Sequence, residues 1–129
     1  MILDSSALVA IVLREPGWEA LSARIRSAGG LVAIGAATLL ETAIVLSARL
    51  NEDSRGRLAR LIQMSEIAVI PFSEDHYAAA MDGWLHYGKG RHPASLNFGD
   101  CLSYATSIVA GEPLLVVGND FAQTDCLLA

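Results

Sequence analysis

The sequence has few of the features that mark secreted or membrane proteins. Its 129 residues include only two cysteines, Cys101 and Cys126, which form neither a CxxC motif nor a disulfide framework. The longest uncharged stretch, Ser27–Leu40, has 14 residues and three glycines, whereas a membrane-spanning helix needs about 20 apolar residues. The opening Met1–Asp4 lacks the basic and apolar regions of a signal peptide. We therefore expect a cytoplasmic protein with reduced thiols and no contact with a membrane.

Positive charge is also scarce. Nine lysines and arginines stand against 14 aspartates and glutamates, which gives a net charge of −5 and by itself disfavours a nucleic-acid-binding protein. However, the single lysine, Lys89, stands close to Arg91 in a glycine-containing segment, and a negative net charge does not prevent local attraction for phosphate. Hydrophobic residues make up 53% and no repeat is present, so we expect one folded domain over residues 1–129.

Short apolar runs alternate with longer segments in which apolar residues recur every three or four positions. The short runs predict strands and the longer segments predict helices. The predicted strands are Met1–Leu3, Leu31–Ile34, Ile67–Pro71 and Leu114–Val117, and the predicted helices are Ala7–Leu13, Gly17–Ser27, Ala36–Leu50, Asn51–Ser65, Glu74–Tyr87 and Asp100–Ala110. This alternation predicts an α/β fold with a parallel sheet covered by helices on both faces.

Four acidic residues occupy positions that suggest a site. Asp4 and Asp120 follow the first and last predicted strands, at the sheet edge where parallel sheets bind ligands. Glu41 is the only charged residue in Gly35–Ala48, and a buried carboxylate needs a partner or a metal. Asp100 opens a predicted helix whose next eleven residues are uncharged. The alternative roles are helix capping for Asp4 and Asp100, and a turn for Asp120.

A divalent cation would reconcile several carboxylates at one point. Close carboxylates repel one another, and some would otherwise hold protons. Oxygen ligands select hard ions such as Mg²⁺ or Mn²⁺, and no spacing of histidine or cysteine indicates zinc. Because the ion would meet a phosphodiester, the acidic composition is compatible with a nucleic-acid substrate.

Five short segments, spread over the whole chain, form a recognisable series. They are Ile2–Ala10, Leu40–Ala43, Tyr87–His92, Leu96–Cys101 and Gly118–Phe121. In this order and spacing they resemble the PIN-domain ribonucleases, and among them the VapC-type toxins of bacterial toxin–antitoxin pairs. The resemblance implies an α/β/α sandwich around a central parallel sheet, with residues 1–129 as a single PIN-like nuclease domain. It also implies endonuclease action on RNA that depends on Mg²⁺ or Mn²⁺.

The resemblance further implies roles for individual residues. The family's catalytic and metal-binding acids match Asp4, Glu41, Asp100 and Asp120, of which Asp4 and Asp100 match the best-defined metal ligands. Three further candidates are Asp125, which could share the fourth acid's role, Ser6, which matches a hydroxyl residue that supports the first aspartate, and Asn119, beside the fourth acid. The family's toxins form homodimers, and a VapB-type antitoxin covers the active site with its C-terminal segment.

Two basic residues, Lys89 and Arg91, are candidates for binding the RNA. Lys89 and Arg91 precede Asp100 by a short loop, so they are expected to draw the RNA backbone towards the acids. The chain is thus predicted to be the endoribonuclease toxin of a type II toxin–antitoxin pair. The alternatives are a non-toxin PIN nuclease in RNA processing and a catalytically inactive PIN-like binding module. A phospho-accepting receiver domain would need a lysine after a late strand, whereas Lys89 is the only lysine.

Overall fold

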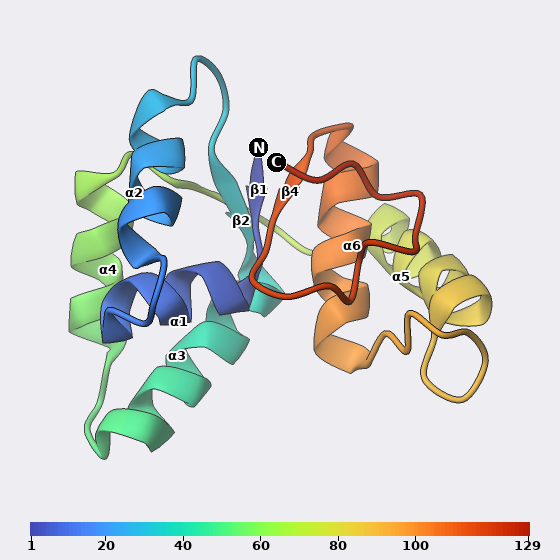
Figure 1. Cartoon of the computed structure of the whole chain (residues 1–129), viewed down its shortest axis with the longest axis horizontal. Coiled ribbons are helices and arrows are strands. Elements are labelled where there is room, and N and C mark those ends of the chain that lie inside the picture. Colours follow the sequence, from blue (N-terminus) through green and yellow to red (C-terminus); the bar gives the residue numbers. More distant parts are fainter.

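The computed structural model describes residues 1–129 and has a four-stranded sheet between two groups of helices (Figure 1). The strands are β1 (Ile2–Leu3), β2 (Ala33–Gly35), β3 (Ala68–Ile70) and β4 (Leu114–Leu115), and the helices are α1 (Ser5–Leu13), α2 (Trp18–Ser27), α3 (Ala36–Leu50), α4 (Arg55–Met64), α5 (Glu74–Tyr87) and α6 (Phe98–Ala110). Helices α1–α4 lie on one side of the sheet and α5 and α6 on the other. This arrangement confirms the predicted α/β/α sandwich.

Two hydrophobic cores lie on the two faces of the sheet, as strand geometry requires. Successive side chains of a strand point to opposite faces, so neighbouring residues of β1 enter different cores. Ile2 packs with Leu114 in the core beneath α6, whereas Leu3 packs with Leu115 in the core beneath α1–α4. All four of these side chains are at most 1% exposed, which explains why such short strands hold the sheet together.

The strand order β3-β2-β1-β4, with every pair parallel, brings the carboxyl ends of all four strands to one edge. Three segments start at this edge in Figure 1: α1 follows β1, α3 follows β2, and the last segment of the chain follows β4. The amino terminus of α6 also lies there. The predicted acids therefore stand on elements that begin at the same edge.

The prediction of a helix over Asn51–Ser65 is wrong in its first four residues. Asn51 has a left-handed backbone, with φ at 50°, and this conformation ends α3. Helix α4 starts only at Arg55, so Glu52 and Asp53 lie in the connection rather than in a helical turn. Arg55 and Arg57, whose side chains are exposed, bind back to Asp53 and Glu52 respectively.

The prediction that Asp100 opens its helix is also wrong. The cap is Asn97, whose side chain accepts a 2.9 Å hydrogen bond from the backbone N–H of Asp100. The Asp100 carboxylate in turn accepts a 2.9 Å bond from the backbone N–H of Asn97, which completes a reciprocal capping box. Helix α6 therefore starts at Phe98, and Asp100 is its third residue.

No helix has the length and apolar character needed to cross a bilayer.

Candidate active site

Asp4 lies at the carboxyl end of β1, where it also caps α1, and only 4% of its surface is exposed. Its Oδ2 accepts hydrogen bonds from the backbone N–H and the hydroxyl of Ser6, at 2.9 and 2.5 Å. Its Oδ1 accepts a 2.6 Å bond from the hydroxyl of Ser103 on α6. The Ser6 hydroxyl accepts a further bond from the backbone N–H of Val117, just beyond β4. These contacts fix the orientation of the Asp4 carboxylate.

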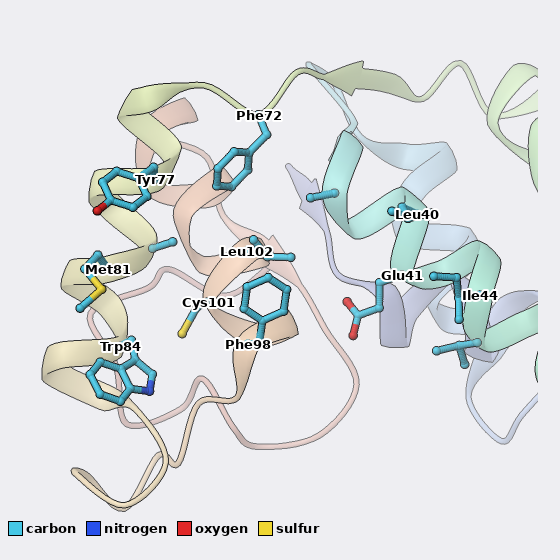
Figure 2. Close-up of a pocket in the computed structure, with 13 residues that line it drawn as sticks. Leu40, Glu41, Ile44, Phe72, Tyr77, Met81, Trp84, Phe98, Cys101 and Leu102 are labelled. Carbon is cyan, nitrogen blue, oxygen red and sulfur yellow. The ribbon is translucent and has the colours of Figure 1, made fainter.

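Glu41 extends from α3 towards α6, as Figure 2 shows. Its Oε2 is buried and has no hydrogen-bond partner. Burial raises the pKa of Glu41, and the negative charge of Asp4 raises it next. The Ser5 hydroxyl acts in the opposite direction, while the charge of Asp100 adds to the rise. Glu41 is therefore a carboxylate whose environment disfavours its negative charge in the absence of a cation.

The pKa of Asp100 is also affected by burial and by the charges of neighbouring acids. Burial raises its pKa, the hydrogen bond from the backbone of Asn97 opposes this rise, and the charges of Asp4 and Asp120 add to it. Asp120 itself is exposed and lies in the segment that follows β4. Electrostatic interactions thus link Glu41 with Asp4 and Asp100, and link Asp100 with Asp4 and Asp120.

Asp125 and Asn119 are placed differently from the four acids. Asp125 accepts a 2.9 Å hydrogen bond from the phenol of Tyr104. Burial raises the pKa of that phenol, and the bond to Asp125 raises it further. Of Asp120 and Asp125, Asp120 is therefore the one whose charge acts on Asp100. Asn119 is exposed, and its backbone carbonyl accepts a 3.1 Å bond from Ala122.

The two basic residues of the loop before α6 differ in their contacts. The Arg91 guanidinium donates to the carbonyl of Leu85 at 3.1 Å and lies 4.9 Å from the centre of the Trp84 ring. It is therefore held against the end of α5. The side chain of Lys89 is exposed and forms neither a hydrogen bond nor an ion pair within the chain, which leaves its charge available to a ligand.

Comparisons with known proteins agree with this architecture. The PIN domain family matches residues 1–126. Ribonuclease VapC36 of Mycobacterium tuberculosis is 44% identical over 125 residues, which cover 97% of this chain and 90% of that protein. The chain belongs to the PIN-domain family, among the VapC ribonucleases. A ribonuclease VapC of Mycolicibacterium smegmatis is 40% identical over 97% of this VapC-family chain and 96% of its own length.

Solved structures share the fold of this PIN domain. VapC20 of Mycobacterium tuberculosis, described as a toxin that cleaves the sarcin-ricin loop, aligns with a TM-score of 0.79 at 18% identity over 99% of this chain and 97% of its own. A toxin–antitoxin complex from Klebsiella pneumoniae aligns with a TM-score of 0.72 at 19% identity, over 99% of this chain and 95% of its own. At such identities the likeness establishes the fold.

The structure of the PIN domain also reveals a residue that the sequence did not single out. Ser103 is fully buried, donates to Asp4, and lies 3.4 Å from the hydroxyl of Thr38 on α3. It stands three positions after Asp100, so both residues occupy the same face of α6. This i, i+3 spacing of a hydroxyl residue and an acid is the signal that could have identified it.

The carboxylate oxygens of the four acids suit a hard cation, although these side chains do not form a preassembled metal site. No three aspartate, glutamate, histidine or cysteine side chains are close enough together to hold one ion between them. Nevertheless, the acids offer only oxygen, and Glu41 carries a buried oxygen without a hydrogen-bond partner. Carboxylate oxygens of this kind, combined with water, are the usual ligands of Mg²⁺. The residues of this PIN domain therefore fit such an ion in donor type and in charge.

Proposed function

We propose that this protein is a Mg²⁺- or Mn²⁺-dependent endoribonuclease, the toxin of a type II toxin–antitoxin pair, and that it acts in the cytoplasm. The proposal rests mainly on one observation, the convergence of acids from four separate segments in a chain whose relatives are VapC ribonucleases. Neither the acids alone nor the family alone would specify hydrolysis of RNA by this chain. Together they support a reaction at a phosphodiester.

The four acids are proposed to act in two pairs. Asp4 and Asp100 would hold the ion, and Glu41 and Asp120 would complete its shell or form a second site. When bound, the ion supplies a water of lowered pKa and neutralises charge on the phosphate. Ser6 and Ser103 keep the Asp4 carboxylate in one orientation. Glu41 has an unpartnered oxygen and a raised pKa, which suit it to accept the proton of the attacking water.

Lys89 and Arg91 are proposed to contact the RNA backbone at the edge of this site. Lys89 is the stronger candidate, because its charge is not engaged within the chain. Arg91 is already bound to Trp84 and Leu85, so it would act from a fixed position or through the loop that it stabilises. Contacts of this kind give affinity that falls as salt concentration rises.

A groove beside the acids is proposed to receive a VapB-type antitoxin. It has a volume of about 870 Å³ and lies between α3 on one side and α5 and α6 on the other (Figure 2). Glu41 is the only charged residue that lines it; the apolar lining includes Leu40, Ile44, Phe72, Met81, Trp84 and Phe98. Leu40, Ile44 and Phe98 are 62%, 60% and 81% exposed. An antitoxin segment that fits this groove would have apolar side chains against its lining and a positively charged side chain near Glu41.

Homodimer formation is proposed from the resemblance to VapC toxins. Analytical ultracentrifugation of the isolated chain, and of the chain with its antitoxin, tests this proposal. A single species with the mass of one 13.7 kDa chain at all concentrations would contradict it.

The proposed activity is tested by incubating the purified protein with total RNA, with and without Mg²⁺, and sequencing the cut ends. We expect cleavage at defined sites that requires the ion and is absent in Asp100→Asn. The capping box should survive this change, because an asparagine oxygen can still accept the bond from Asn97. No cleavage of any RNA by the wild-type protein would favour the inactive binding module. Cleavage without growth arrest on expression would favour the non-toxin processing nuclease.

A further inference from the structure

Gly99 lies in the first turn of α6, directly against the Glu41 carboxylate. A Cβ atom at position 99 would lie 2.3 Å from Glu41 Oε1, 2.8 Å from Cδ and 2.9 Å from Oε2. Ordinary contact begins only at 3.4 Å. The Glu41 carboxylate therefore fills the space that any side chain at position 99 would need.

The backbone offers no other reason for glycine at this position. Gly99 is the second residue of a regular helix and is not among the residues with positive φ, so its conformation is open to any residue. Glycine is moreover a poor helix former compared with alanine. The close approach of Glu41 is the remaining structural feature that requires the absence of a side chain.

We infer that Gly99 is a positioning residue for Glu41: it leaves open the place in which the Glu41 carboxylate approaches Asp4 and Asp100. This inference rests on the proposed function only in treating Glu41 as part of the active site. The charges of Asp4 and Asp100 both act on Glu41, which is the arrangement that Gly99 permits.

A methyl group at position 99 would move the carboxylate rather than break the fold. The shortest clash is about 1 Å inside ordinary contact, and the atoms concerned are the far end of a flexible side chain. Glu41 extends from α3 into the side of the groove, where there is room for it to swing away. In an active site a displacement of about 1 Å can reduce the rate by about 100-fold.

The first experiment compares Gly99→Ala with Gly56→Ala. Gly56 is a matched control, because it is also the second residue of its helix, α4, and a methyl group added there would have nothing within 4 Å. We expect both variants to melt at or above the wild-type temperature. Only Gly99→Ala should lose about 10- to 100-fold in kcat on RNA and bind Mn²⁺ more weakly in an electron paramagnetic resonance titration.

The second experiment tests whether space at position 99 is the cause. Glu41→Asp shortens the side chain by one methylene and withdraws the carboxylate from the added methyl group. We expect Glu41→Asp to reduce activity in the wild-type background. In the Gly99→Ala background it should reduce activity less, or restore part of it, so the two changes should not be independent. Crystal structures of wild type and Gly99→Ala should show the Glu41 carboxylate displaced away from α6.

Three results would overturn the inference. They are kcat of Gly99→Ala within twofold of wild type, independent effects of the two changes, and an unmoved Glu41 carboxylate in the Gly99→Ala crystal structure. Failure of the proposed function is distinguishable, since the wild-type protein itself would then cleave no RNA. The crystallographic comparison would still decide the placement of Glu41 in that case.

Discussion

The hydroxyl of Ser103 donates a 2.6 Å hydrogen bond to Oδ1 of Asp4, a residue 99 positions earlier in the chain. The bond joins α6 to the carboxyl end of β1, and so it fixes the distance between the elements that carry Asp100 and Asp4. Both partners are buried, at 0% and 4% exposure. A hydrogen bond to a buried carboxylate is among the stronger ones in a protein, because water cannot replace it.

Ser103→Ala is therefore expected to affect both stability and activity. Loss of a donor to a buried charged group should cost about 1–3 kcal/mol in the free energy of unfolding. Loss of a residue that orients a metal ligand typically reduces activity by about 10- to 100-fold. Chemical denaturation and RNA cleavage assays measure the two effects.

Ser107→Ala is the control for this change. The Ser107 hydroxyl is also buried on α6, one turn later, but it donates to the carbonyl of Glu112 rather than to an acid of the site. We expect a similar loss of stability with activity close to wild type. Equal loss of activity in the two variants would show that Ser103 acts only through the stability of α6.

The acids should give the metal-free protein an unusual dependence on pH. The pKa values of Glu41 and Asp100 are raised above their ordinary values of 4.5 and 3.8, so the folded state holds these protons more tightly than the unfolded state. Their contribution to stability is full below the ordinary values and is lost as pH rises through the raised ones. When a chelator keeps metal ions away, the free energy of unfolding of Glu41→Gln should therefore increasingly exceed that of wild type as pH rises towards neutrality.

Urea denaturation at several pH values measures this difference. Glu19→Gln is a suitable control, because Glu19 is exposed on α2 and forms no ion pair. A constant difference between Glu41→Gln and wild type at all pH values would contradict the raised pKa of Glu41.

Mn²⁺ or Mg²⁺ should stabilise the folded protein, since only the folded chain brings the acids together. At an ion concentration 100 times Kd the expected gain is about 2.7 kcal/mol. Differential scanning calorimetry over a series of Mn²⁺ concentrations should show a rising melting temperature for wild type and a smaller rise for Asp100→Asn. An unchanged melting temperature at millimolar Mn²⁺ would count against ion binding by the isolated chain.

The salt dependence of RNA binding should identify the contribution of Lys89. In an Asp100→Asn background, which prevents cleavage, Lys89→Ala should reduce the slope of log K against log salt by about 0.7, the value for one contact to a single-strand phosphate. Arg26→Ala, which removes one exposed positive charge on α2, is the control for net charge. An unchanged slope for Lys89→Ala would show that this side chain does not contact phosphate.

Much of the fold follows from local patterns that the sequence displays. Strands and helices alternate as predicted, because periodicity and capping residues act over a few positions. The errors arose where two signals competed. Asn51 ends α3 in a left-handed conformation, although the acids that follow it would suit the first turn of a helix. Asn97 caps α6, although Asp100 is the more conspicuous residue.

The site was less predictable, because its decisive contacts join residues that are distant in sequence. Glu41 is the only charged residue in Gly35–Ala48, which indicated burial, and the structure adds that its Oε2 has no hydrogen-bond partner. The contact of Ser103 with Asp4 and the closeness of Gly99 to Glu41 depend on how α6 packs against β1 and α3. No local pattern specifies that packing.

The pairing of β1 with β4 has a consequence for the synthesis of the protein. Leu3 pairs with Leu115, and the backbone N–H of Asp4 donates to the carbonyl of Leu115. During translation β1 therefore emerges from the ribosome long before β4, one of its two neighbours in the sheet, has been made. Until residues 114–120 have been made, the nascent chain lacks β4, Asp120 and the hydrogen bond from the backbone of Val117 to Ser6. The site that we propose for this PIN domain can therefore assemble only after residues 114–120 have been synthesised.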